Sequence, residues 1–291
     1  MYFGITLPSY GQEVDPSAIL DTAQAAEAFG YHSVWTTDHI LLPEMDSTRF
    51  RSLYESITTL AFIAGQTDRI RLGISSLVLP MRDPILAAKQ LAALDVLSGG
   101  RAMLCVSVGW SKGEYKNLGH DFHTRGARLD EAIDVMRLLW NSSGDPVSFN
   151  GTFYNFPSSI FDPVPLQPCG PELWVGGNSQ AARKRAARKD AVWHPSSLHL
   201  DAFQAGAAAY HALIKKGAPA GIAPRLRVTF GRQDPEAHLS GSPAEIGARL
   251  EQYHQAGMTG AVLSFNAASQ EERRGFMKEF METTAPELRG A

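Results

Sequence analysis

The sequence predicts an α/β fold of the (β/α)8, or TIM, barrel class, in which parallel strands alternate with helices. Eight short apolar segments are each followed by a helical pattern. These segments are nearly continuous apolar runs, which is typical of parallel strands buried on both faces. The length of 291 residues suits one such barrel, so we expect residues 1–291 to form a single domain. An open doubly wound sheet is the alternative, but no G-x-G-x-x-G pattern follows the first strand.

The predicted strands end in Gly, Pro, Ser or Asp. They cover 2–8, 33–37, 70–76, 102–108, 172–177, 190–194, 225–230 and 260–265. The sixth unit is the least regular, because 195–224 is rich in Ala, Ser, Gly and Pro. The stretch 146–171 breaks the alternation, and "VSFNGTFYNF" within it indicates a hairpin with Asn150-Gly151 at its tip. We therefore expect an insertion between the fourth helix and the fifth strand.

The helices have recognisable start and stop signals. Three begin with a capping residue followed by proline, and a glycine follows the end of each. The starts are Asp15-Pro16, Asp83-Pro84 and Ser242-Pro243, the last with Glu245 completing a capping box, and the glycines are Gly30, Gly99 and Gly257. In the fourth helix an apolar stripe is expected from Leu129, Ile133, Met136 and Trp140.

Composition narrows the function classes. The chain is 44% hydrophobic and 20% charged with a net charge of −3, so it offers no sign of binding nucleic acid or an anionic membrane. Its two cysteines lack metal-type spacing, and its nine histidines include no H-E-x-x-H pattern, so no metal site is expected. No segment reaches the roughly 18 apolar residues of a membrane span, and "MYFGITLP" does not resemble a signal peptide. We expect a cytoplasmic protein.

In a barrel of this class, chemistry belongs at the carboxyl ends of the strands. Asp38 and His39 follow the second strand. An imidazole with a pKa near 6.5 can exchange a proton at neutral pH, and a neighbouring carboxylate can orient it. Adjacent residues on an extended chain point in opposite directions, so the pair needs a bend to act together. Ordinary turn chemistry is the alternative interpretation.

The third and fourth strands end in further candidates. Ser75 and Ser76 are small and polar, either as a satisfied hydroxyl pair or as a tight bulge on which a flat ligand can lie. Gly109 permits close approach of the backbone, and Trp110 can stack on a ring or pack against outer helices.

Two more candidate sites follow the fifth and sixth strands. Gly176-Gly177 and Asn178-Ser179 open a basic helix, which indicates an anion site or a plain capped turn. The basic run 183–189 is most simply a solvated helix face that could also attract an anionic cofactor tail. His194 follows the sixth strand as a second imidazole.

Five stretches taken together resemble the bacterial luciferase-like monooxygenase superfamily, and most of all its oxidoreductases that depend on coenzyme F420. The resemblance extends over nearly the whole chain in matching order, and the family fold is a barrel with an insertion near the middle. The stretches are "SVWTTDHILLP", "RIRLGISSLVLPMRDPILAAKQLAALDVLSGGR", "VGWSKGEYKNLG", "PELWVGGNSQAARKRAAR" and "GSPAEIGARLEQYHQAGMTGAVL".

The resemblance implies roles for these residues. His39 matches the position beside the reactive carbon of the cofactor ring, and Ser75-Ser76 matches a bulge with a non-prolyl cis peptide that supports the ring. Two further groups match loops that hold the phosphate and ribityl parts: Ser107, Val108, Gly109 and Trp110, and Gly176, Gly177, Asn178 and Ser179. The sequence departs from many relatives, which have Gly, at Ser107 and Val192, and it has Trp110 where sugar-phosphate dehydrogenases of the family carry a catalytic glutamate.

We therefore expect an F420-dependent oxidoreductase that transfers hydride between the deazaflavin and a small organic substrate. His39 would carry the accompanying proton, Asp38 would support it, and Tyr10, Trp110 and His194 would line the substrate pocket. The alternatives are an FMN-dependent monooxygenase on the same fold, a non-catalytic flavin- or deazaflavin-binding protein, and a sugar-processing barrel hydrolase. A homodimer is expected from the resemblance and from base rates.

Overall fold

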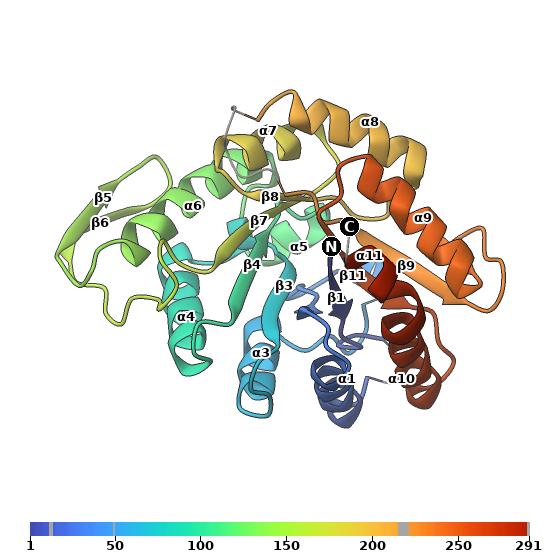
Figure 1. The fold of residues 1–291 in the computed structure, drawn as a ribbon. Helices are drawn as coiled ribbons and strands as arrows, with labels where there is room; N and C mark the ends of the chain where they lie inside the picture. Colours follow the sequence, from blue (N-terminus) through green and yellow to red (C-terminus); the bar gives the residue numbers. More distant parts are fainter. Residues whose placement is uncertain (12–13, 49, 215–220, 290–291) are drawn as a thin grey trace. The chain divides into compact units, whose positions relative to one another are not determined.

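The computed structural model describes residues 1–11, 14–48, 50–214 and 221–289 (Figure 1). These residues form two compact units, each built from separate segments of the chain. The first unit contains 1–8, 15–35 and 174–291, and the second contains 9–14 and 36–173. That residues 1–291 form a single domain stays a prediction.

Parallel strands form the centre of the first unit. Their order is β10-β9-β11-β1-β2, and β7 pairs with β8. Two isolated bridges, Trp193 to Ile222 and Ser196 to Arg225, join the β8 region to the β9 region. The strands are β1 (Tyr2–Thr6), β2 (Ser33–Thr36), β7 (Glu172–Gly176), β8 (Val192–His194), β9 (Arg225–Phe230), β10 (Leu239–Gly241) and β11 (Gly260–Phe265).

The helices of the first unit confirm the predicted start signals. The Asp15 side chain accepts a hydrogen bond from the backbone of Ser17, and Ser242 and Glu245 form a complete capping box. Gly30 has a φ of 79°, as a glycine after a helix end requires. The helices are α1 (Pro16–Ala28), α7 (Gln180–Arg188), α8 (Leu200–His211), α9 (Pro243–Gln255), α10 (Gln270–Glu279), the π-helical turn η3 (Phe280–Thr284) and α11 (Ala285–Arg289).

The second unit contains the parallel pair β3 (Arg71–Leu77) and β4 (Ala102–Val106), whose register shifts between Ile74 and Leu77. This shift falls at the bulge predicted around Ser75 and Ser76. An antiparallel hairpin, β5 (Val147–Asn150) and β6 (Asn155–Ser159), is the predicted insertion. The helices are α2 (Glu44–Ser47), α3 (Ser56–Ala64), η1 (Leu79–Met81), α4 (Pro84–Leu97), α5 (Lys112–Asn117), η2 (Phe122–Thr124) and α6 (Arg125–Trp140).

Every predicted strand has a counterpart, and the apolar stripe of α6 is buried as its spacing predicts. The short strand β10 was not predicted, because the stretch "LSG" has too little apolar periodicity to indicate a strand. In the irregular sixth unit, α8 is observed and 215–220 lie outside the described residues. Within the described ranges, no helix has the length and apolar character needed to cross a membrane.

Candidate functional site

His39 is fixed by a buried carboxylate from a distant part of the second unit. Its Nδ1 lies 2.8 Å from Oε2 of Glu114, which belongs to α5. The Glu114 side chain has no solvent exposure, and that of His39 is 8% exposed. The two residues are 75 positions apart in sequence. His39 therefore has a defined ring orientation that its own loop does not provide.

The charge on Glu114 selects the tautomer of His39. Burial raises the pKa of Glu114, but hydrogen bonds from His39 and from the backbone of Ile40 and Leu41 outweigh it, and the net pKa is lowered. Oε1 accepts from Ile40 N at 2.6 Å and from Leu41 N at 3.2 Å. Because an ionised carboxylate only accepts hydrogen bonds, Nδ1 of His39 is the donor. Nε2 is then the ring nitrogen that can gain or lose a proton.

The sequence around Glu114 has the appearance of a capping box that the structure uses differently. Ser111 and Glu114 fit the S-x-x-E pattern, and the Ser111 hydroxyl does accept a hydrogen bond from Glu114 N at 3.1 Å. The Glu114 carboxylate does not return to Ser111 but bonds the loop after β2. The Ser111 hydroxyl in turn donates to Asp46 at 2.5 Å. The start of α5 thus holds the segment that carries His39.

The Asp38 carboxylate bonds Ser56, Val78 and Arg82. It is buried, and its Oδ1 lies 2.5 Å from Arg82 Nη2 and accepts from the Ser56 hydroxyl at 2.9 Å. Its Oδ2 accepts from the backbone of Val78 at 3.0 Å. Burial opposes the charge on Arg82, but the carboxylates of Asp38 and Glu55 outweigh it and raise the pKa of Arg82. Glu114, and not Asp38, bonds Nδ1 of His39, and the expected support of His39 by Asp38 stays a prediction.

The serine pair at the end of β3 has the backbone geometry that the family resemblance implies. The peptide bond between Ser75 and Ser76 is cis. Ser75 is buried, and the Ser76 hydroxyl lies 3.2 Å from the thiol of Cys105 on β4. Burial raises the pKa of Cys105 to about 12, so this thiol is neutral. Ser107 is half-buried, and its backbone donates to Leu77 O at 2.9 Å.

Gly109 is required by the backbone after β4. Its φ is 64°, and a Cβ at this position would lie 2.6 Å from Cγ1 of Val78 and 3.2 Å from Cε of Met81. The carbonyl of Val108 accepts from the Tyr115 hydroxyl at 2.7 Å. These contacts direct the chain so that Trp110 emerges with 52% of its surface exposed.

Aromatic side chains surround the His39 ring. Its centroid lies 4.7 Å from that of Phe50 and 5.6 Å from that of Trp110, which is edge-on. Phe50 also contacts Tyr10, with centroids 5.2 Å apart. We call Tyr10, His39, Phe50 and Trp110 the aromatic cluster. Of the predicted pocket walls, Tyr10 and Trp110 belong to it.

The predicted anion loop lies in the first unit. Gly177 has a φ of 123°, and the Ser179 hydroxyl caps α7 through Ala182 N. The Asn178 side chain donates to Ser196 O at 2.8 Å and accepts from Ser196 N at 3.0 Å, which ties the loop after β7 to the loop after β8. The run 183–189 is not simply a solvated face, because Arg185 and Lys189 are buried.

His194 is an interior residue of the first unit. It is 2% exposed, and its ring is stacked at 14° on Trp35 and lies 5.4 Å from Trp174. Nδ1 bonds to the carbonyl of Ala223. Burial lowers the pKa of His194 to about 4, so the ring is neutral near pH 7. This environment is typical of a structural histidine, and its place in a substrate pocket stays a prediction.

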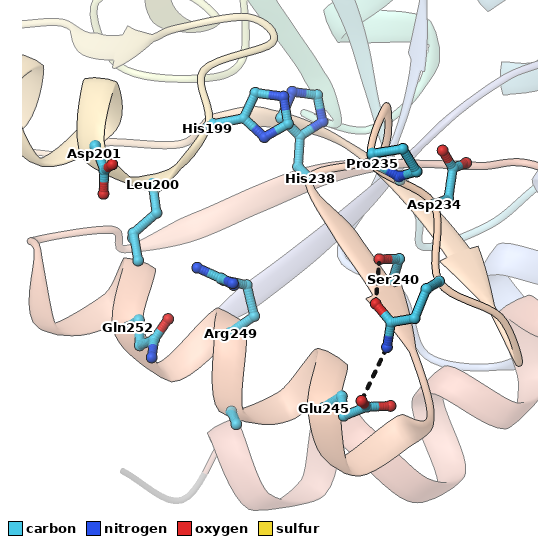
Figure 2. A pocket seen from close by; sticks show the side chains of 13 residues that line it. His199, Leu200, Asp201, Asp234, Pro235, His238, Ser240, Glu245, Arg249 and Gln252 are labelled. Atoms are coloured by element: carbon cyan, nitrogen blue, oxygen red, sulfur yellow. Dashed lines mark hydrogen bonds between the residues drawn. The ribbon is translucent and has the colours of Figure 1, made fainter.

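A cavity of about 640 Å³ lies elsewhere in the first unit, between the start of α8, β10 and α9 (Figure 2). The rings of His199 and His238 meet at its edge, with centroids 4.8 Å apart. Glu245 is already bonded to Ser242 and Gln233. The cavity contains none of the residues that the sequence marks as functional. It also holds no metal-ligand group, because the described residues contain no cluster of three or more His, Cys, Asp or Glu with suitable placement.

The chain belongs to the luciferase-like monooxygenase family, whose sequence model matches residues 1–282. The FMNH(2)-dependent dimethylsulfone monooxygenase of Pseudomonas putida is 30% identical over 239 residues, which are 79% of this chain and 63% of that protein. The crystal structure of monooxygenase RslO1 from Streptomyces bottropensis superposes with a TM-score of 0.85 at 22% identity, covering 99% of this chain and 100% of that one. The structure of the coenzyme F420 dependent tetrahydromethanopterin reductase from Methanopyrus kandleri superposes with a TM-score of 0.81 at 16% identity. The superposition covers 98% of this chain and 99% of that one.

These likenesses confirm the predicted fold class and the resemblance. Members of the family are oxidoreductases or monooxygenases, and its neighbours include proteins named for FMN and for F420. The comparisons support an enzyme of the oxidoreductase or monooxygenase class.

Sequence reasoning missed Glu114, Phe50 and Arg82. Glu114 stands in "SKGE", a spacing that also fits an ordinary capping box, so the local pattern does not single it out. Phe50 lies in a loop without periodicity, so nothing in the sequence brings it to His39. Arg82 precedes a helix start in "RDP", and no local pattern there marks it as the partner of a buried carboxylate.

Proposed function

We propose that the protein is an oxidoreductase that uses coenzyme F420 and transfers a hydride between the deazaflavin ring and a small organic substrate. The observation that carries the proposal is the hydrogen bond from His39 Nδ1 to the buried Glu114. It leaves Nε2 as the atom that takes or gives the proton accompanying hydride transfer.

Small and aromatic side chains at or after the ends of β3 and β4 suit a flat ring. Ser75 and Ser76 supply small side chains at a bulged strand end, and Trp110 supplies an exposed aromatic face. The buried charges close to this set are paired within the protein, Glu114 with His39 and Asp38 with Arg82. A bound deazaflavin supplies the hydride chemistry, and the protein supplies orientation and electrostatics. In this proposal Ser75 and Ser76 support the ring, and 107–110 contact the ribityl part.

Gly176 to Ser179 are proposed to bind the phosphate part of the cofactor. The backbone N–H of Gly177 donates to His194 O at 3.2 Å, so the phosphate would instead lie at the positive end of the α7 dipole. The Asn178 side chain is already fixed to Ser196, so the loop needs little reordering. This assignment is separate from that of His39 and is tested separately, by the loss of cofactor affinity in Gly177→Val.

The direct test is a spectroscopic titration of the purified chain with oxidised F420 and, in parallel, with FMN. We expect F420 to bind and FMN to bind more weakly. If neither cofactor binds, the proposed function fails. If FMN alone binds, the reaction class changes to the second candidate described below.

The role of His39 is tested with His39→Gln. We expect cofactor binding to be retained and turnover to fall about 10²-fold, the usual contribution of a positioned acid or base. Unchanged turnover would remove His39 from the mechanism. His123→Gln, on the exposed turn η2, is the control for the substitution itself.

The second candidate is an FMN-dependent monooxygenase. It is favoured by the 30% identity to a protein named as an FMNH(2)-dependent dimethylsulfone monooxygenase. Substrate-dependent consumption of oxygen with reduced FMN would support it. Cofactor binding without turnover of any substrate would instead indicate a carrier or sensor.

We further propose that the protein acts in the cytoplasm as a homodimer. The absence of a membrane-spanning helix among the described residues is compatible with this location. The dimer follows from base rates for enzymes of this size. Light scattering coupled to gel filtration measures the oligomeric state, and cell fractionation measures the location.

A further inference from the structure

The cavity between the start of α8, β10 and α9 contains an unused pair of opposite charges (Figure 2). Its volume of about 640 Å³ is sufficient for a small organic molecule. Asp201 lies in the first turn of α8 and Arg249 in the middle of α9, and both residues are exposed. The proposed function does not involve this cavity, so an inference about it is independent of that function.

Asp201 and Arg249 have no side-chain partners inside the protein. Within the part of the chain that the structure describes, neither charged group forms a hydrogen bond or an ion pair. Both charges nevertheless act on one hydroxyl: burial raises the pKa of Tyr253 to about 12, with Arg249 lowering it and Asp201 raising it. In Figure 2 the Arg249 guanidinium extends toward the start of α8, where Asp201 lies. A single small molecule can therefore reach both charges.

Two further carboxylates of the cavity are already bonded. Glu245 accepts from the Gln233 side chain at 2.9 Å, and the backbone of Ser242 lowers the pKa of Glu245. Asp234 accepts from the Thr229 hydroxyl at 2.7 Å, which lowers the pKa of Asp234. Both carboxylates are thus ionised near pH 7. Their negative charge favours a ligand that carries a cationic group over a simple anion.

The rest of the wall limits the ligand further. Arg249 is the single Lys or Arg among the described lining residues, so a ligand carboxylate has one strong partner there. A guanidinium binds a carboxylate through two parallel hydrogen bonds. Leu200, Ala237 and Ala248 add aliphatic surface to the same wall, which suits an aliphatic side chain on the ligand.

We propose that this cavity binds a small zwitterion of the aliphatic α-amino acid type. The ligand carboxylate pairs with Arg249, its ammonium group pairs with Asp201, and its side chain lies against Leu200 and Ala248. The two charges that the protein leaves unused are then both compensated.

Three matched compounds test this assignment. L-Leucine is the probe, L-leucinol keeps the ammonium group but lacks the carboxylate, and N-acetyl-L-leucine keeps the carboxylate but lacks the ammonium group. Their dissociation constants are measured on the purified chain at pH 7 by NMR titration. We expect L-leucine to bind about 3- to 5-fold more tightly than either analogue, the range of one partly exposed ion pair.

Substitutions assign each charge to its partner. Arg249→Gln is expected to weaken L-leucine about 3- to 5-fold without weakening L-leucinol. Asp201→Asn is expected to weaken both compounds that carry an ammonium group, but not N-acetyl-L-leucine. Arg274→Gln is the matched control, because Arg274 is an exposed arginine on α10 that does not line the cavity. It should leave all three affinities unchanged.

The inference has clear contrary outcomes. It is overturned if L-leucine does not bind, or if neither Arg249→Gln nor Asp201→Asn changes its affinity. Tighter binding of L-leucinol than of L-leucine would also overturn it, because the cavity would then be a site for simple cations. Thermal unfolding confirms that each variant is folded, and the F420 titration of the same variants tests the proposed function separately.

Discussion

At the scale of single residues, the molecule separates two neighbours that the sequence groups together. Asp38 and His39 are adjacent, yet Asp38 bonds Arg82 and Ser56 while His39 bonds Glu114. One carboxylate binds Ser56 on α3, the backbone of Val78 and Arg82, and the other fixes the imidazole. Each carboxylate has a role because the extended backbone sends adjacent side chains to opposite sides.

The Glu114 contact leads to a testable prediction for Glu114→Gln. The amide can still accept from Ile40 and Leu41, but its NH₂ group now faces Nδ1 of His39, which must become an acceptor. We expect the His39 tautomer to change, which nitrogen-15 NMR of the imidazole detects, and turnover to fall about 10²-fold with an altered pH profile.

Glu131→Gln is the matched control for this experiment. Its carboxylate also accepts from three backbone groups, those of Thr152, Phe153 and Tyr154, but it contacts no histidine. We expect normal turnover and an unchanged pH profile in this variant. A Glu114→Gln enzyme with the wild-type pH profile would show that Glu114 is only structural.

Gly109 gives a second prediction at this scale. Gly109→Ala places a Cβ 2.6 Å from Cγ1 of Val78 in a backbone with a φ of 64°. We expect a loss of about 2 kcal/mol or more in the free energy of unfolding, from left-handed strain and overpacking together. Urea denaturation measures it.

The Val78→Ala background separates these two causes. It removes the atom nearest to the new Cβ. The backbone strain of about 1 kcal/mol then remains, with a 3.2 Å contact to the flexible end of Met81. An equal loss in both backgrounds would show that the contact with Val78 is not responsible.

At the scale of elements, capping patterns indicate where a helix starts, but they do not always indicate which group the carboxylate in the pattern binds. Ser242 and Glu245 form the reciprocal box that "SPAE" predicts. Ser111 and Glu114 have the same spacing but form only one of the two bonds, the one from Glu114 N to the Ser111 hydroxyl. The difference arises because the loop after β2 offers Glu114 an imidazole and two backbone N–H groups, which together favour its charge more than one local bond does.

The capping box of α9 allows a direct comparison. Ser242→Ala removes the hydroxyl that accepts from Glu245 N, and we expect a loss of about 1 kcal/mol in the free energy of unfolding without loss of cofactor binding. Ser111→Ala should add an effect on turnover, because Ser111 also binds Asp46 in the segment that carries His39. If the two variants have identical effects on stability and on turnover, α5 is an ordinary capped helix.

At the scale of the whole molecule, buried histidines make stability depend on pH. Burial lowers the pKa of His194 from 6.5 to about 4. Burial, together with His199 and Arg227, lowers the pKa of His238 to about 4. The folded state thus favours the neutral rings. Their stabilising contribution is complete above the unfolded pKa of 6.5 and is lost as the pH falls through 4.

We therefore expect the free energy of unfolding to decrease between pH 6.5 and pH 4, by on the order of 3 kcal/mol for His194 alone. His194→Gln should show a shallower decrease over this range. Urea titrations at three pH values measure the slope. A slope that is unaffected by the substitution would assign the acid sensitivity to other groups.

Much of the architecture could be read from the sequence. Eight strand positions, three helix starts and the inserted hairpin follow from apolar runs, capping residues and turn residues, all of which act over a few neighbours. The positions of Asp38, His39, Ser75 and Trp110 at strand ends follow from the same local patterns.

Only the tertiary structure decided which of these residues work together. The pairing of His39 with Glu114 joins positions 75 residues apart, and Phe50 reaches His39 from a loop with no periodic pattern. His194 is an interior ring that contacts both Trp35 and Trp174. Local chemistry determines where strands and helices begin, because those choices depend on near neighbours. A buried charge pairs with the group that best offsets its desolvation in the folded chain. That group can lie far away in the sequence, so no short stretch of sequence identifies it.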